Sequence, residues 1–277
     1  MTKNDTADQA KVHSIDDRLS QDVSDPLPVD EHVEEVFDGG KKVSYKKVYL
    51  LPNLFTTGAL FSGFYAIIVS MLGQFEAAAI AIFAAMILDG LDGRVARLTN
   101  TSSSFGLQYD SLADMVSFGV APAIVVLNWG LLSLGKMGWA VSFAYTACAA
   151  LRLARFNTQT KFADKRFFIG LASPAAAAMI ASIVWVWHDV AISMPMKLMV
   201  AFSMIVLGLL MVSNLTYNSF KGIDLKGRVS FAAMLLVIFI FVLVVSNPSV
   251  VLLVIALLYS LSGPSLWIWQ RIRSAKA

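Results

Sequence analysis

Four aspartates lie close together in a part of the chain that is otherwise poor in acids. From Leu50 to the C-terminus the sequence has only eight acidic residues, and half of them fall between positions 89 and 114. These are Asp89, Asp92, Asp110 and Asp114. The first two are three residues apart and the last two are four apart, so on helices each pair lies on one face. If the two helices form a hairpin, all four carboxylates face one another.

Carboxylate oxygens in that number favour a hard divalent cation. Mg²⁺ and Mn²⁺ take oxygen ligands, whereas zinc prefers His and Cys, and neither residue type occurs between positions 77 and 147. Two ions can share four carboxylates, as in sites that transfer phosphoryl groups. The sequence therefore predicts a site for two Mg²⁺ or Mn²⁺ ions.

Small residues beside the aspartates leave room for a ligand. Side-chain bulk is low at Gly90, Gly93, Ala96 and Gly106. Such positions permit either close helix packing or a bound molecule. Arg97 follows Gly93 by four residues, so on a helix its guanidinium lies one turn beyond that gap and can bind phosphate. The alternative for Arg97 is an arginine that only reaches from its helix to the membrane surface.

The elements that must position these residues are membrane helices. Only 15% of the chain is charged, against roughly 25% in soluble domains, and several uncharged runs reach the about 20 residues that span a bilayer as helix. The longest run is divided by the turn signal Ser246-Asn247-Pro248-Ser249. The sequence therefore predicts an all-α integral membrane protein with about eight transmembrane helices. Their expected ranges are 51–73, 77–98, 106–132, 137–157, 167–187, 197–217, 229–245 and 249–269.

The positions of lysine and arginine predict the orientation of these helices. If the N-terminus is cytoplasmic, the inner ends and loops collect nearly all Lys and Arg, and the outer ends have only Lys136 and Lys197. Both termini and the aspartate site are therefore expected to face the cytoplasm. The net charge of +3 follows from this bias and does not indicate binding to nucleic acid.

The chain divides into four predicted parts. Residues 1–40 have eleven acids, three Lys or Arg and no apolar periodicity, which predicts an acidic disordered cytoplasmic tail. Residues 41–50 mix Lys with Val, Tyr and Leu, which predicts a short basic amphipathic helix at the membrane surface, or an ordinary positively charged flank. Residues 51–217 then hold the catalytic transmembrane helices. Residues 218–277 form a C-terminal transmembrane hairpin with a basic cytoplasmic end.

A transporter is the alternative class of protein that places acids inside a membrane. A cation or proton-coupled transporter uses them along an ion pathway, with polar groups that reach both faces. Here the outer halves of the predicted spans are nearly free of ionisable groups, and His188 and Asp189 are expected to be solvated loop residues at the outer face. This distribution favours an enzyme.

The aspartates belong to a longer pattern, D-x2-D-G-x2-A-R-x8-G-x3-D-x3-D. Its fixed positions are Asp89, Asp92, Gly93, Ala96, Arg97, Gly106, Asp110 and Asp114. By this pattern the chain resembles the CDP-alcohol phosphotransferase family. Within the family it is similar to the bacterial membrane-embedded branch that uses serine. That likeness rests on "DGLDGRVARLTNTSSSFGLQYDSLADMVSFGVAPA", "LRLARFN" and "GLASPAAA", which begin at positions 89, 151 and 170.

The resemblance implies a reaction and residue roles. Family members displace CMP from a CDP-linked lipid or alcohol by attack of a hydroxyl, with divalent metal held by the aspartates; here CDP-diacylglycerol and L-serine would give phosphatidylserine. Asp114 would be both a metal ligand and the general base. The CDP moiety would lie along Gly93, Ala96, Arg97 and Gly106. The resemblance also implies a homodimer in a bacterial inner membrane, with glycerol 3-phosphate or inositol phosphate as the nearest alternative acceptors.

Serine carries a carboxylate and an ammonium that the site must recognise. Arg152 and Arg155 are three residues apart at the cytoplasmic end of the fourth predicted span, followed by Asn157. A planar guanidinium suits the serine carboxylate or a lipid phosphate, and the alternative is a positively charged helix end. Asn53 and Thr56 lie one turn apart where the first span begins. They are expected to face the nucleotide diphosphate, or else to be only a polar start to the helix.

Overall fold

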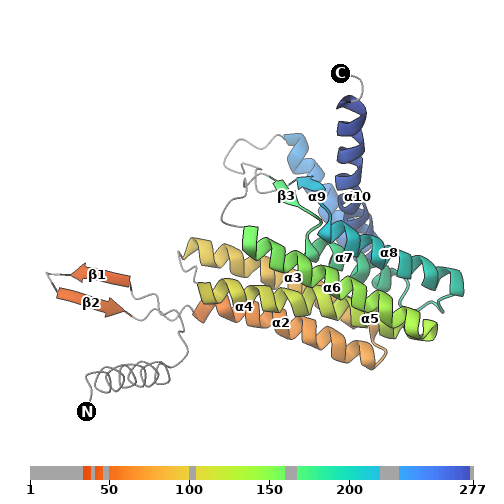
Figure 1. The fold of residues 1–277 in the computed structure, drawn as a ribbon, viewed down its shortest axis with the longest axis horizontal. Helices are drawn as coiled ribbons and strands as arrows, with labels where there is room; N and C mark the ends of the chain where they lie inside the picture. Colours follow the sequence, from red (N-terminus) through yellow and green to blue (C-terminus); the bar gives the residue numbers. More distant parts are fainter. Residues whose placement is uncertain are drawn as a thin grey trace, which may run out of the picture.

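Helices make up nearly all of the described chain (Figure 1). The structure is a computed structural model that describes residues 34–38, 41–45, 50–99, 104–159, 167–218 and 231–274. Its α-helices are α2 (Leu50–Met71), α3 (Phe75–Leu98), α4 (Ser104–Asp114), α5 (Ala121–Trp129), α6 (Lys136–Gln159), α7 (Ser173–Val186), α8 (Met194–Val212), α9 (Phe231–Ser246) and α10 (Pro248–Ser274). The π-helix η1 (Met115–Val120) joins α4 to α5, and the 3₁₀ helix η2 (Leu131–Leu134) precedes α6. The short strands are β1 (Glu34–Asp38), β2 (Lys41–Tyr45), β3 (Phe167–Ile169) and β4 (Thr216–Asn218).

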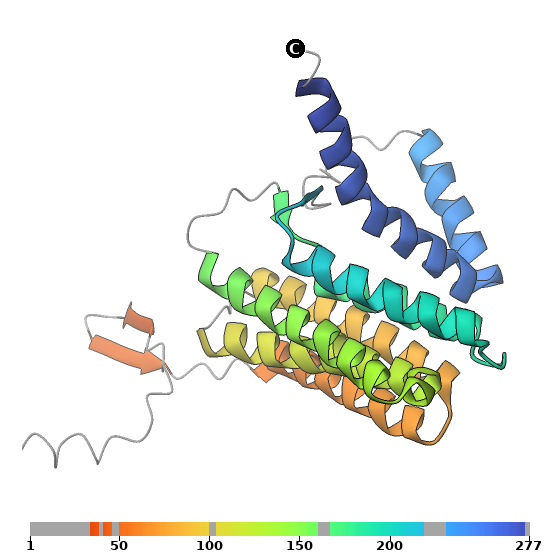
Figure 2. The same cartoon turned by 45° about the vertical axis from the view of Figure 1, so that its right-hand side comes forward.

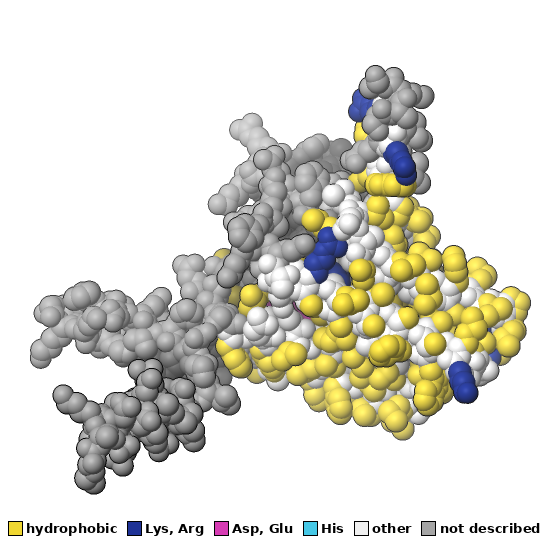
Figure 3. Space-filling model, in the orientation of Figure 1, with side chains coloured by type: hydrophobic (Ala, Val, Ile, Leu, Met, Phe, Trp, Pro, Cys, Tyr) yellow, Lys and Arg dark blue, Asp and Glu magenta, His cyan; other side chains and the backbone are white. Residues whose placement is uncertain are grey.

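The helices have the composition of membrane segments. In lipid each backbone N–H and C=O must find its partner within the protein, which favours helices. Four described segments are long and apolar enough to cross a membrane, namely Pro52–Met71, Phe105–Trp129, Met194–Val212 and Pro248–Trp267. Hydrophobic side chains cover most of the bundle face shown in Figure 3. The predicted all-α membrane class is thus confirmed, while the count of eight crossings stays a prediction.

The packing of the helices places α2 at the centre of the first half of the chain. Helix α2 contacts α3, α4, η1 and α5, whereas α6 contacts η1 and α8. Helix α7 contacts α3 on one side and α10 on the other. Both ribbon views show α2 to α6 side by side (Figures 1 and 2). Below, the site end means the end of this bundle at which α3 ends at Leu98 and α4 begins at Ser104.

The prediction of an amphipathic helix before the first span is wrong for residues 41–45. These residues form strand β2, which pairs antiparallel with β1 and places Val36 opposite Val43. In the sequence Lys-Lys-Val-Ser-Tyr, Val and Tyr alternate with polar residues, and this period of two favours a strand. The predicted disordered tail includes strand β1, and the other residues of 1–40 lie outside the described residues.

Strands β3 and β4 pair at the site end and shorten two predicted spans. The spans expected at 167–187 and 197–217 are helical only from Ser173 and only as far as Val212. The amide of Gly170, which follows β3, donates to the carbonyl of Leu215 at 2.8 Å. Gly170 has a φ of 82°, which side chains rarely adopt, and a Cβ there would overlap the carbonyl oxygen of Met211. The chain therefore turns at Gly170 before α7 begins.

A glycine lets α2 approach η1 directly. Ser117 of η1 donates its hydroxyl to the carbonyl oxygen of Ala59 at 3.0 Å. A Cβ built on Gly63 would lie 2.6 Å from the Ser117 Oγ and 2.7 Å from its Cα. A side chain at Gly63 would therefore displace η1, and with it the end of α4. At Gly58 on the same helix, a Cβ would meet only the tip of the Leu88 side chain, at 3.3 Å.

Replacing Gly63 with alanine is expected to destabilise the protein by about 1–3 kcal/mol, because side-chain rotation cannot relieve an overlap with backbone atoms. The measurement is thermal unfolding of the purified protein in detergent, with Gly58→Ala as the matched control. Equal unfolding temperatures for the two variants would contradict the close packing of α2 on η1.

Candidate active site

The structure brings the four predicted aspartates together at the site end. Asp89 and Asp92 lie on α3, and Asp110 and Asp114 lie on α4. Carboxylate oxygens of the first three lie within 4.8 Å of one another. The carboxyl of Asp114 is in hydrogen-bond contact with that of Asp89. These four residues are called the acidic cluster below.

Helix α2 holds one member of the acidic cluster through a buried threonine. Thr56 is 4% exposed, and its hydroxyl donates to Asp92 Oδ2 at 2.7 Å. The neighbouring Thr57 contacts the Tyr109 hydroxyl at 2.9 Å, which ties α2 to α4, and donates to the carbonyl of Asn53 at 2.7 Å. Thr56 therefore contacts a carboxylate of the cluster, a partner that its position in the sequence did not reveal.

The π-helix η1 begins directly after Asp114 and depends on donors from α6. A π-helix is a rare, wide turn that is frequent at functional sites. Tyr145, which is fully buried, donates its hydroxyl to the carbonyl of Phe118 at 3.0 Å. The Thr146 hydroxyl lies 3.4 Å from the carbonyl oxygen of Gly119 and 3.0 Å from that of Ser142 in its own helix. Sequence reasoning missed both residues, and their only signal was two adjacent hydroxyls in an apolar span.

Open space borders the acidic cluster on the α3 side. A Cβ built on Gly90 or Gly93 would meet no other heavy atom within 4 Å. Ala96 and Gly106 are partly buried nearby on α3 and α4. The backbone of Arg97 lies in α3, and its side chain is outside the described part of the chain. Gly90 and Gly93 are thus unobstructed by other parts of the chain, and a ligand gap there stays a prediction.

The two predicted arginines have different partners. Arg152 donates to the hydroxyl of Ser173 at 2.5 Å and lies within electrostatic range of Asp114 and Asp89. Arg155 instead donates to the carbonyl of Val212 at 3.2 Å and to Asn214 Oδ1 at 2.6 Å, just beyond the end of α8.

The third predicted polar residue of α6 bonds to the helix that carries two of the aspartates. The amide of Asn157 donates to the hydroxyl of Ser111 on α4 at 3.0 Å. Of the three polar residues proposed on α6, Arg152 is the one whose charge interacts with the acidic cluster. Asn157 instead joins α6 to α4 by a hydrogen bond.

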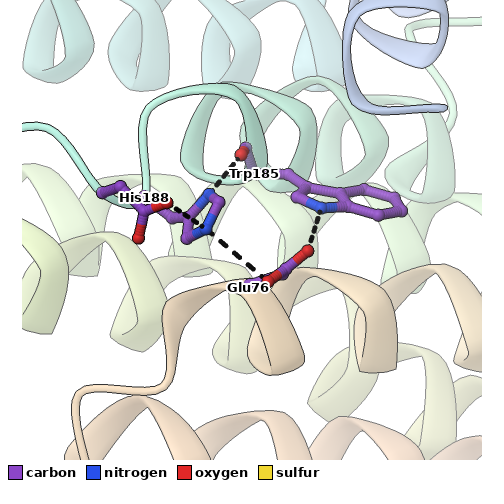
Figure 4. A network of polar contacts seen from close by, with 4 residues as sticks. Glu76, Trp185 and His188 are labelled. Carbon is purple, nitrogen blue, oxygen red and sulfur yellow. Dashed lines mark hydrogen bonds and ion pairs between the residues drawn. The ribbon is translucent and has the colours of Figure 1, made fainter. Parts of the chain in front are cut away.

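A separate polar network lies at the opposite end of the bundle (Figure 4). The indole of Trp185 donates to Glu76 Oε1 at 3.2 Å, and His188 Nε2 lies 3.6 Å from Glu76 Oε2 and 3.0 Å from Asp189 Oδ2. These contacts join the start of α3 to the end of α7. Asp189 is exposed as predicted, and His188 lies in the same turn with its side chain 24% exposed.

The acidic cluster can hold a hard divalent cation. Its donors are carboxylate oxygens from two helices, and among the described residues no His or Cys belongs to the group. Thr56 orients one of these carboxylates, and the Arg152 guanidinium offsets part of their charge. With open space beside the carboxylates, a phosphate-bearing ligand can reach a metal held there.

Known proteins are similar to this chain in sequence. The profile of the CDP-alcohol phosphatidyltransferase family matches residues 49–262. The CDP-diacylglycerol-serine O-phosphatidyltransferase of Helicobacter pylori (strain J99) is 40% identical over 229 residues, which cover 82% of this chain and 94% of that protein. The Bacillus subtilis protein of the same name is 31% identical over 172 residues, 62% of this chain and 91% of that one. The archaetidylserine synthase of Methanothermobacter thermautotrophicus is 35% identical over 174 residues, 62% and 71% of the two chains.

Replacing Thr56 with valine is expected to weaken Mn²⁺ binding about tenfold or more, because a residue that orients a metal ligand is typically worth that much affinity. The measurement is titration of purified protein with Mn²⁺, with free Mn²⁺ followed by electron paramagnetic resonance. Thr57→Val is the matched control and is expected to bind Mn²⁺ as the wild type does. An equal loss in both variants would show that the Thr56 hydroxyl has no particular role.

Proposed function

The chain belongs to the CDP-alcohol phosphatidyltransferase family, and we propose that it transfers the phosphatidyl group of CDP-diacylglycerol to the hydroxyl of L-serine, giving phosphatidylserine and CMP. The observation that carries this proposal is the acidic cluster, which lies between open space on α3 and the guanidinium of Arg152. The names of the similar bacterial proteins support serine as the acceptor. Family membership also removes the transporter hypothesis.

The acidic cluster is proposed to hold two Mg²⁺ or Mn²⁺ ions. Asp89, Asp92 and Asp110 supply the closest group of carboxylate oxygens, and Asp114 joins them through its contact with Asp89. Bound divalent ions neutralise the diphosphate and stabilise CMP as the leaving group. Thr56 donates a hydrogen bond to Asp92 and so keeps that carboxylate oriented toward the other carboxylates of the acidic cluster.

Asp114 is proposed as the general base. It accepts the hydroxyl proton of serine while the serine oxygen attacks the phosphorus of the donor. A new phosphorus–oxygen bond forms as the bond from phosphorus to CMP breaks, and CMP leaves with the electron pair. The proton remains on Asp114. This role suits a residue that lies at the end of α4 beside Arg152, which keeps a positive charge near the attacking group.

The donor is proposed to lie on the α3 side of the cluster. The open space beside Gly90 and Gly93 accommodates the cytidine diphosphate, with Ala96 and Gly106 along it. Arg97 and Asn53 keep their proposed places beside the diphosphate on the strength of their sequence positions. Thr56 reaches the diphosphate only through Asp92.

Arg152 is proposed to bind the carboxylate of serine, and Arg155 is proposed to hold the end of α8 instead. The guanidinium of Arg152 has five N–H donors, of which Ser173 takes one. Among the described side chains, Arg152 is the basic group for which electrostatic interaction with the acidic cluster is evident. Acceptors that carry a phosphate would need further basic side chains, so this surrounding favours serine.

The membrane arrangement completes the proposal. Eight helices cross a bacterial inner membrane, with both termini and the site end on the cytoplasmic side and Lys136 and Lys197 on the outer side. Residues 51–217 hold the catalytic helices, and residues 218–277 add a transmembrane hairpin with a basic end. Two copies form a homodimer, as the family resemblance implies. Residues 1–40 are a cytoplasmic tail.

Purified protein is expected to release CMP from CDP-diacylglycerol when serine and Mn²⁺ or Mg²⁺ are present. Asp114→Asn should lower the rate by about 10²-fold or more, because a general base typically contributes that much. Glycerol 3-phosphate and inositol phosphate are offered in parallel, and size-exclusion chromatography checks that the variant is folded. Release with one of those acceptors instead of serine would keep the chemistry and change the product.

Arg152→Lys is expected to raise the KM for serine about tenfold, because a hydrogen bond to a charged group is lost or weakened. Arg155→Lys should leave that KM unchanged and lower the unfolding temperature, since its partners are Val212 and Asn214. The measurement is serine-dependent CMP release together with thermal unfolding in detergent. The opposite pattern would reverse the roles of the two arginines.

A further inference from the structure

The last helix is fixed to the site end by one buried tyrosine. Tyr217 on β4 is fully buried, and its hydroxyl donates to the carbonyl oxygen of Ser260 on α10 at 3.2 Å. A Cβ built on Gly263 would overlap the ring of Tyr217, so the ring packs directly on the backbone of α10. Strand β4 is in turn paired with β3, which precedes α7.

Proline explains why α10 needs this contact. Pro264 lies inside the helix and has no N–H, so the carbonyl four residues earlier, that of Ser260, loses its helical donor. In a membrane helix such a freed carbonyl must find another donor. The Tyr217 hydroxyl supplies it, and Figure 2 shows α10 bending along its length. The tyrosine therefore holds α10 at one depth and one rotation.

That position of α10 places a second tyrosine near Arg152. Tyr259 directly precedes Ser260, and its ring lies 5.7 Å from that of Tyr217. Tyr259 is within electrostatic range of Arg152, which is itself in range of Asp114 and Asp89. The Tyr217 ring thus contacts Tyr259 on α10, and Tyr259 is linked to the proposed base electrostatically, through Arg152.

We propose that α10 completes the acceptor subsite, with the Tyr259 hydroxyl donating to the serine carboxylate beside Arg152. This inference rests on the proposed function and extends it to a helix outside the aspartate pattern. Tyr217 is the positioning residue that sets Tyr259 in place.

The chemistry of the surroundings favours an acceptor carboxylate at this position. In the proposed function the donor diphosphate lies on the α3 side of the cluster, where Gly90 and Gly93 meet no other part of the chain. Arg152 comes from α6 and bonds to Ser173 at the start of α7, and α10 packs against α7. A small anion between Arg152 and Tyr259 would therefore meet a planar cation and a phenol donor, which together suit a carboxylate.

The test compares Tyr259→Phe with wild-type protein in CMP release from CDP-diacylglycerol. The KM for serine is expected to rise about tenfold, because one hydrogen bond to a charged group is removed, while kcat and the KM for CDP-diacylglycerol stay within about twofold. Tyr65→Phe is the matched control, since Tyr65 is exposed on α2 and stacks on Phe61. It should leave all three constants unchanged.

A second acceptor separates binding from general disturbance of the site. L-serine amide has no carboxylate, so wild type and Tyr259→Phe are expected to use it equally well. An equal loss with serine and with the amide would overturn the proposed contact. Tyr217→Phe, which keeps the ring and loses only the bond to Ser260, should raise the serine KM in the same direction as Tyr259→Phe.

The outcomes also separate this inference from the proposed function. A wild-type protein that releases CMP only with another acceptor would overturn both. A wild type that uses serine, together with a folded Tyr259→Phe variant whose serine KM is unchanged, would overturn the acceptor subsite alone and leave the synthase activity standing.

Discussion

The structure depends on the repulsion and desolvation of four carboxylates that share one place between helices of membrane composition. A single charged side chain at the centre of a bilayer costs about 2.5–3.5 kcal/mol on insertion scales, so a group of four within such a bundle needs partners from several elements. Thr56 of α2 donates to one carboxylate, and Arg152 of α6 offsets the charge of two others. The helices that supply these partners must therefore pack around the α3–α4 hairpin. The four carboxylates still repel one another after these contacts are made. The site therefore favours cations, because a divalent ion would relieve that repulsion.

Hydroxyl groups donate to backbone carbonyls at two places where a described helix departs from the α-helical pattern. Tyr145 donates to the carbonyl of Phe118 in the π-helix that follows Asp114, and Tyr217 donates to the carbonyl of Ser260 before Pro264. Each irregularity would leave an unpaired carbonyl in a medium without water, which is costly. Each lies beside a residue with a proposed role, since η1 directly follows Asp114 and Ser260 directly follows Tyr259. The wide turn of η1 changes the direction of the chain directly after Asp114. The bend at Pro264 lies about one turn after Tyr259 and affects how that residue is placed.

The sequence was sufficient to predict most helical segments and the pairing of the aspartates on helix faces, because both follow from local patterns. Uncharged runs gave the helical segments, and spacings of three and four gave the shared faces of Asp89 with Asp92 and of Asp110 with Asp114. It was insufficient where distant segments decide the outcome. Strands β3 and β4 form only because their chain segments meet at the site end. Arg152 and Arg155 are the same residue type on the same helix. Arg155 bonds to the end of α8, whereas Arg152 interacts with the acidic cluster.

The glycines of this chain differ in their surroundings, and the difference has a consequence for how the protein can be changed. A methyl group at Gly63 collides with η1, whereas a methyl group at Gly90 or Gly93 meets nothing within 4 Å. Alanine is favoured over glycine within a helix by about 1 kcal/mol, so stability alone would select alanine at the latter two positions. A survey of variants scored by yield or heat resistance would rank alanine at Gly90 and Gly93 as an improvement. A screen for turnover would instead test whether glycine at these two positions serves the proposed donor site.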